Sequence, residues 1–189
     1  MIFGFEKLGY AVSMAAPQVL VSLAEYDART DAGERLEYTD GVIEPMPNKD
    51  SVHDVLKACL NTALARQTGE GVQVVCEMAF ALEPDIIRHP DVAVLLREPP
   101  TRPGAKVAGA PDLAVEIVSE SDYARQLDDR VELYLEHGAQ AVWVVWPDKH
   151  RIDVHQPGQP TRHLRGGWLR GEKPVSEFRL DLDTFFSGI

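Results

Sequence analysis

Two carboxylates stand in apolar stretches of the sequence where folding alone gives no reason for an acid. Asp91 opens the apolar run 91–95, and Glu116 lies inside the run 113–118. An ionised carboxylate buried in such a run costs several kcal/mol unless a cation or hydrogen-bond donors compensate its charge. These two acids are therefore the first candidates for chemistry.

A divalent metal ion would compensate the negative charges of both acids. Two carboxylates on adjacent strands, with a main-chain carbonyl beside them, supply the oxygen ligands that Mg²⁺ prefers. Ile117, directly after Glu116, would provide the carbonyl. An ion held there would lower the pKa of an attacking water at a phosphodiester. The alternative is structural, with Asp91 capping a strand start after Pro90 and Glu116 paired with an arginine, and the residues alone leave both interpretations open.

Other chemistry has weaker support in the sequence. His53 begins a long amphipathic stretch, from which it would donate a hydrogen bond or position water at the same centre. A histidine at a helix start is more often a capping or surface residue. The sequence has no zinc-ligand spacing, no Gly-x-Gly-x-x-Gly or phosphate-loop lysine motif and no Gly-x-Ser-x-Gly setting. The carboxylate pair therefore remains the main candidate site.

Apolar periodicity and turn signals predict the elements that position these residues. Asp40-Gly41 between two β-prone runs predicts a hairpin. The order strand, helix, strand over 111–146 predicts two parallel neighbours. The whole pattern predicts an α+β fold, a mixed sheet flanked by helices with both acids on its middle strands. The predicted helices span 17–30, 52–68 and 123–137, the last capped by 119–122, and the predicted strands span 72–75, 78–82, 87–95, 111–119, 141–146 and 151–155.

Length and composition indicate one ordinary globular domain. The chain has 189 residues, of which we expect 17–189 to form the domain and 1–16 an N-terminal arm without regular structure. No signal peptide or membrane span is predicted. Cys59 and Cys76 lie in apolar contexts, which predicts two reduced core thiols in a cytoplasmic protein.

The charge is unevenly distributed along the chain. The formal net charge of -11 argues against a general nucleic-acid coat, because phosphate binding requires Lys and Arg. Within the C-terminal third, the stretch 149–173 nevertheless holds six Lys and Arg residues with few acids between them, which leaves room for a local basic face. These are Lys149, Arg151, Arg162, Arg165, Arg170 and Lys173.

Several short stretches of the sequence together resemble a known protein family. They are the hairpin 36–43, His53, the segment 90–93, the segment 109–119 (GAPDLAVEIVS), and Tyr134, Gly138, Val142 and Trp143. Together they resemble the bacterial Uma-type restriction endonuclease family, within the PD-(D/E)XK nuclease superfamily and its restriction endonuclease-like fold. The likeness extends from about Leu20 to Phe186, and the segment 109–119 is its most specific part.

The resemblance assigns roles and also shows a departure from the family motif. It makes Asp91 the acid of the first half-motif and Glu116 the acid of the second. The lysine expected two residues later is absent, since Val118 stands there. In the family this basic role usually moves to a lysine four residues before a tyrosine, and here Arg130 precedes Tyr134. Arginine stabilises phosphate charge but is a poor proton acceptor.

The resemblance implies a metal-dependent endonuclease that cuts DNA by metal-activated water. Mg²⁺, or alternatively Mn²⁺, would be held by Asp91, Glu116 and the Ile117 carbonyl, with Arg130 at the scissile phosphate and His53 assisting. A homodimer is expected, because a double-strand cut needs two centres. The second hypothesis is a degenerate nuclease fold that serves as a DNA-binding or protein-interaction module. A hydrolase of small phosphorylated molecules would fit the acidic composition but has no motif.

Overall fold

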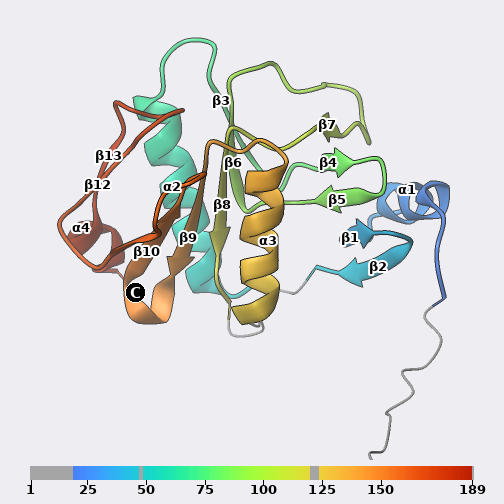
Figure 1. The fold of residues 1–189 in the computed structure, drawn as a ribbon, viewed down its shortest axis with the longest axis horizontal. Helices are drawn as coiled ribbons and strands as arrows, with labels where there is room; N and C mark the ends of the chain where they lie inside the picture. Colours follow the sequence, from blue (N-terminus) through green and yellow to red (C-terminus); the bar gives the residue numbers. More distant parts are fainter. Residues whose placement is uncertain (1–18, 47–48, 120–123, 189) are drawn as a thin grey trace, which may run out of the picture.

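Two mixed sheets form the frame of the protein, which a computed structural model describes over residues 19–46, 49–119 and 124–188 (Figure 1). The predicted arm at 1–16 and the helix-capping stretch 120–122 lie outside the described residues. The α+β class and the mixed, helix-flanked sheet predicted from the sequence are confirmed. The strands are divided between two large sheets, where the sequence predicted a single sheet.

The larger sheet carries both candidate acids. Its strand order is β11-β10-β9-β8-β6-β3. β8 and β9 run parallel, as predicted, and the other neighbours are antiparallel. The strands β6 and β8, which adjoin the two acids, pair directly. The bounds are β3 (Gln73–Cys76), β6 (Val92–Leu95), β8 (Leu113–Ile117), β9 (Ala141–Trp146), β10 (Arg151–His155) and β11 (Arg162–Leu164).

The smaller sheet begins with the predicted hairpin and has the order β2-β1-β5-β4-β7. Asp40 and Gly41 adopt positive φ values of 50° and 86°, the conformation that a two-residue type I′ hairpin turn requires. A further two-stranded ladder joins β12 and β13 near the C-terminus. The bounds are β1 (Leu36–Thr39), β2 (Val42–Pro45), β4 (Phe80–Glu83), β5 (Ile86–Arg88), β7 (Val107–Ala108), β12 (Trp168–Arg170) and β13 (Arg179–Asp181).

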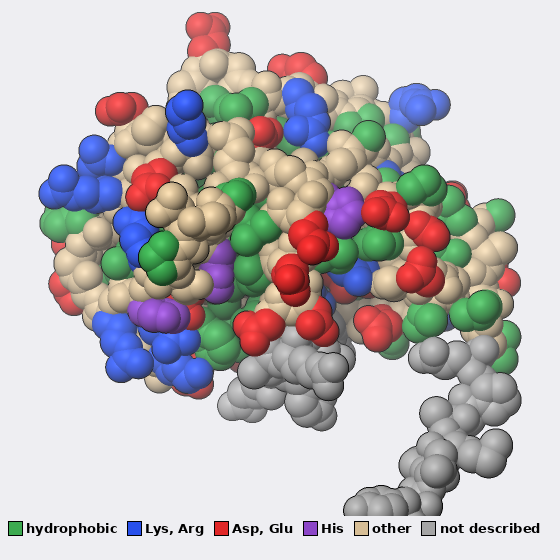
Figure 2. Space-filling view, viewed as in Figure 1, with side chains coloured by type: hydrophobic (Ala, Val, Ile, Leu, Met, Phe, Trp, Pro, Cys, Tyr) green, Lys and Arg blue, Asp and Glu red, His purple; other side chains and the backbone are tan. Residues whose placement is uncertain are grey.

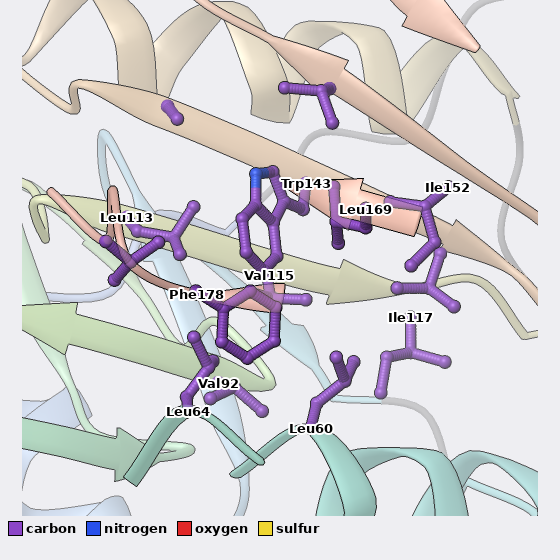
Figure 3. Packing of buried hydrophobic residues seen from close by; sticks show 14 of the residues in the cluster. Leu60, Leu64, Val92, Leu113, Val115, Ile117, Trp143, Ile152, Leu169 and Phe178 are labelled. Carbon is purple, nitrogen blue, oxygen red and sulfur yellow. The ribbon is translucent and has the colours of Figure 1, made fainter. Parts of the chain in front are cut away.

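Helices cover both faces of the larger sheet. On one face, buried leucines of α2 (Ser51–Gln67) pack with Val115, Ile117 and Trp143 (Figure 3). On the other, apolar side chains of α3 (Ala124–Glu136) pack with Ala114 and Val144. Alternate strand residues point to opposite faces, so Glu116 lies on the α3 face. The remaining helices are α1 (Leu23–Asp31), α4 (Leu182–Phe186) and the 3₁₀ turn η1 (Pro147–Lys149).

The predicted strand over 87–95 is interrupted at its centre. β5 belongs to the smaller sheet and β6 to the larger one, so the chain changes sheets between them. Pro90 lacks the N–H that a continuous ladder would require. The strands predicted as a pair over 72–75 and 78–82 are likewise separated, since β3 and β4 lie in different sheets. The interruption places Asp91 at the junction of the two sheets.

Two smaller predictions were wrong. Cys59 and Cys76 are exposed, because Cys59 lies outside the buried stripe of α2 and Cys76 ends the edge strand β3. α1 begins at Leu23 after the cap Ser22, whereas the sequence predicted a helix from residue 17. Within the described residues, no helix combines the length and apolar character needed to cross a membrane.

Candidate active site

Asp91 ties the two acid-bearing strands together. Its side chain is buried, and Oδ2 accepts a hydrogen bond of 2.7 Å from the main-chain N–H of Ile117. Burial alone would raise the pKa of Asp91, but the adjacent His53, the charge of Lys49 and the Ile117 N–H outweigh it and lower that pKa. Asp91 is therefore held in the ionised form at the end of β8.

His53 reaches Asp91 from the first turn of α2. Asp50 caps this helix by accepting a 2.8 Å hydrogen bond from the His53 main-chain N–H. The imidazole is 1% exposed, and its Nε2 lies 3.0 Å from Asp91 Oδ1. Neither ring nitrogen makes a well-aligned hydrogen bond to any of the described residues. A buried ring with two unsatisfied nitrogens beside a carboxylate is poised for a further polar partner.

Glu116 is buried on the α3 face of β8. Tyr134 donates its hydroxyl to Oε1 over 2.9 Å, and Arg130 Nη1 donates to Oε2 over 3.4 Å. Burial raises the pKa of Glu116 to about 7, and the negative charges of Asp91 and Glu37 act in the same direction against Arg130 and Tyr134. The donors around Glu116 therefore compensate its charge only in part.

Arg130 joins Glu116 to a third buried acid on the smaller sheet. Its Nη2 donates to Glu37 Oε2 over 3.2 Å, and Glu37 is 5% exposed. Glu37 also accepts a 3.4 Å hydrogen bond from the His89 main-chain N–H and lies 4.0 Å from the Arg88 guanidinium. Glu37 thus fixes the guanidinium of Arg130 in front of Glu116.

The sequence reasoning missed two members of this cluster. Tyr134 stands one helical turn after Arg130, so the two side chains share a face of α3 and meet Glu116 together. Its spacing from Arg130 is a usable signal, although the apolar pattern of the sequence favours a core role for Tyr134 and the resemblance uses it only as part of the family motif. Glu37 stands between the buried residues Leu36 and Tyr38, as Glu116 stands inside an apolar run. That strand is only four residues long, and a hairpin strand is more often half exposed.

A cleft gives solvent access to this cluster. Its volume is about 480 Å³, and it lies between the first hairpin and α3. Both partners of the Arg130–Glu37 pair line it. The other lining residues are Thr39, Asp40, Val42, Glu44, Arg88, Asp129 and Leu133.

The donor set fits a hard divalent cation with few protein ligands. In the described part of the chain, no three His, Cys, Asp or Glu side chains are grouped so that they could hold a metal ion. The candidate ligands are therefore Asp91, Glu116 and a main-chain carbonyl. Mg²⁺ commonly uses one or two carboxylates and keeps several waters. Burial is the main cause of the raised pKa of Glu116, and such a cation would stabilise the ionised form of this buried carboxylate.

The family profile and the fold place the chain among restriction endonuclease-like proteins. The profile of the family described as "Uma2: Putative restriction endonuclease" matches residues 23–183, and the chain belongs to this family. A solved structure with the same fold is the crystal structure of "a putative nuclease belonging to DUF820" from Anabaena variabilis. It is 22% identical, has a TM-score of 0.70, and the match covers 80% of this chain and 89% of that one. No curated protein matches the sequence.

Proposed function

We propose that the protein is a metal-dependent endonuclease that hydrolyses DNA phosphodiester bonds. The observation that carries this proposal is Glu116, a buried and incompletely compensated carboxylate beside the ionised Asp91 and the donor Arg130. Buried carboxylates with strongly perturbed pKa values concentrate at functional sites. Membership of the family supports the same conclusion.

Asp91, Glu116 and the Ile117 carbonyl would hold Mg²⁺, or alternatively Mn²⁺. The bound ion would lower the pKa of the attacking water and stabilise charge on the phosphate. Asp91 is prepared for this role because the Ile117 N–H fixes its orientation and its lowered pKa keeps it ionised. Glu116 would enter the ionised form when a cation compensates its burial.

Arg130, beside Glu116, and His53, beside Asp91, would have different roles. Arg130 offers several N–H groups in a planar fork, which suits a scissile phosphate, and Glu37 holds the guanidinium in place. Its high pKa excludes it as a general base. His53, with both ring nitrogens unsatisfied, would orient Asp91 or a water molecule near it.

Cleavage of supercoiled plasmid DNA with Mg²⁺ or Mn²⁺ tests the proposal. Asp91→Asn and Glu116→Gln keep the side-chain shapes and remove the charges, and we expect each to lower the rate by about 10²–10³-fold. The control is Glu132→Gln, which removes an exposed carboxylate from α3. Equal cutting by all four proteins would show that the activity comes from another source.

A second candidate function rests on Val118 and Arg130. Val118 takes the place of the motif lysine, and Arg130 already forms an ion pair with Glu116. A nuclease fold modified in this way would serve as a DNA-binding or protein-interaction module without catalysis. Calorimetric titration with Mn²⁺ separates the two functions. Binding that is lost in Glu116→Ala favours the enzyme, whereas a wild-type protein that binds no Mn²⁺ favours the module.

The assembly and location belong to the same proposal. Cutting both strands of a duplex requires two active centres, so we expect a homodimer. A cytoplasmic location fits a DNA substrate and the two free cysteines, Cys59 and Cys76. Sedimentation of the protein with and without duplex DNA measures the oligomeric state.

A further inference from the structure

A second buried acid lies in line with Glu116 on the larger sheet. Asp153 of β10 is 4% exposed. Glu116 pairs with Val144, and Val144 pairs with Asp153. Asp153 in turn pairs with His163 of the edge strand β11. Directly paired residues point to the same face, and three strand spacings place His163 about 14 Å from Glu116.

Asp153 organises basic side chains beside α3. It accepts hydrogen bonds from Trp146 Nε1 at 2.9 Å, from Arg151 Nη2 at 2.8 Å and from His163 Nδ1 at 2.6 Å. The Trp146 ring carries two cations, with Lys149 Nζ at 3.8 Å and Arg151 Cζ at 5.0 Å from its centroid. A buried acid and an indole ring thus hold these cations in fixed positions.

Arg165 extends this basic group across the end of the sheet. Leu164 pairs with Ile152, so Arg165, after Leu164, and Arg151, before Ile152, lie at the same end of the β10–β11 ladder. Lys149 and Arg165 are exposed, and neither forms an ion pair with any described residue. We call these four basic residues the cationic shelf: Lys149, Arg151, His163 and Arg165.

The cationic shelf contrasts with the rest of this acidic protein. Figure 2 shows Lys and Arg side chains gathered with a histidine at the lower left, over the β9–β10 end, whereas acids gather along α3. The shelf and the candidate site lie at the same end of the larger sheet, because the Val118 N–H, just after β8, donates to the Val145 carbonyl over 2.9 Å, just before Trp146. On the other side of Glu116, the cleft is lined by the acids Glu37, Asp40, Glu44 and Asp129.

We infer that the cationic shelf binds the phosphodiester backbone of duplex DNA on one side of the cleavage point. The inference rests on the proposed nuclease function, because that function makes duplex DNA the substrate. A DNA duplex bound at the candidate site would be repelled by the acids of the cleft on one side of Glu116 and attracted by the basic residues of the shelf on the other side. At 3.4 Å per base pair, about 14 Å corresponds to phosphates roughly four base pairs from the cut.

Salt-dependent DNA binding tests the shelf independently of cleavage. Fluorescence anisotropy with a labelled DNA duplex is measured between about 50 and 200 mM salt in the Glu116→Gln background, which prevents cutting. We expect the added double variant Lys149→Gln/Arg165→Gln to weaken binding roughly tenfold and to reduce the salt slope by about 2. The matched control Arg66→Gln/Arg102→Gln removes two exposed cations elsewhere and should bind as the background protein does.

The outcomes distinguish the shelf from the nuclease function. The shelf inference would be overturned if the two double variants weakened DNA binding equally, or if the shelf variant did not weaken it. Tighter binding to an RNA duplex of the same length would also overturn it. If the shelf variant alone loses binding while Glu116→Gln cuts plasmid as the wild type does, the shelf stands and the proposed active site fails. If Glu116→Gln abolishes cutting but the added shelf substitutions leave DNA binding unchanged, the proposed active site stands and the shelf inference fails.

Discussion

Glu116 and Asp153 occupy the same row and the same face of one sheet, yet their surroundings differ. Asp153 accepts hydrogen bonds from three side chains between 2.6 and 2.9 Å. Glu116 accepts from Tyr134 at 2.9 Å and from Arg130 at 3.4 Å, and it shares Arg130 with Glu37. Burial raises the pKa of Glu116, and the negative charges of Asp91 and Glu37 raise it further.

The difference separates an acid that stabilises the fold from one that is prepared for a ligand. A buried carboxylate with its full set of donors organises its neighbours. A buried carboxylate beside other acids lacks compensation that only an added cation or a proton can supply. Removing each charge should therefore affect stability in opposite directions.

The largest effect is expected for Asp153→Ala. The substitution leaves the half-buried guanidinium of Arg151 and the half-buried indole N–H of Trp146 without their acceptor, and the loss of a buried charged partner costs about 3–5 kcal/mol. Urea unfolding at neutral pH measures the change. The control is Asp148→Ala, an exposed acid on the neighbouring turn, which should cost less than about 0.5 kcal/mol. Similar values for both would show that Asp153 does not organise this region.

Glu116→Gln should have a smaller effect of opposite sign. The pKa of Glu116 is raised from 4.5 to about 7 in the folded protein, so the folded state binds the proton more tightly than the unfolded state. Wild-type stability should therefore fall as pH rises from about 4.5 to about 7 and then level off. The glutamine variant lacks this fall. The difference in free energy of unfolding between the variant and wild type should therefore be roughly 3 kcal/mol more favourable to the variant above about pH 7 than at low pH.

Unfolding of both proteins between about pH 4 and pH 9 measures this difference. Glu132→Gln, which removes an exposed acid of α3, should follow the wild-type profile. A stability difference between wild type and Glu116→Gln that stays constant over the range would contradict the comparison. Added Mn²⁺ should stabilise wild type above about pH 7 and leave Glu116→Gln unchanged.

The sequence predicted the part of this comparison that depends on local pattern. Apolar runs with one acid each identified Asp91 and Glu116, and the strand-helix-strand order correctly predicted that β8 and β9 are parallel. Pro90 contained the signal for the break between the sheets, but only the pairing of β5 and β6 with different partners reveals it.

The remaining part depends on contacts between distant segments. Glu37 and Arg130 are separated by 93 positions, and no local pattern predicts that the first hairpin faces α3. Asp153 lies in the strand 151–155, whose alternation of polar and apolar residues is typical of a strand with one solvated face, yet Asp153 is buried beneath its own donors. Long amphipathic side chains such as Arg151 can cover an acid that alternation would place in water.

The smallest effect is expected for Tyr134→Phe. This change removes the hydroxyl that donates to Glu116, and a hydrogen bond to a charged group contributes about 1.5–3 kcal/mol. Its control is Tyr38→Phe, which loses a hydrogen bond of 3.0 Å to the neutral Val21 carbonyl and should cost about 1 kcal/mol at any pH in the range.

The two tyrosines therefore differ in pH dependence more than in size of effect. The Tyr134 hydroxyl lowers the pKa of Glu116 by favouring its ionised form, so its removal raises that pKa further. The cost of Tyr134→Phe should grow as pH rises through about 7, where Glu116 ionises in the wild type, while the cost of Tyr38→Phe stays level. Parallel profiles would mean that Glu116 keeps one charge state throughout, and that its burial beside Asp91 is compensated within the fold as completely as that of Asp153.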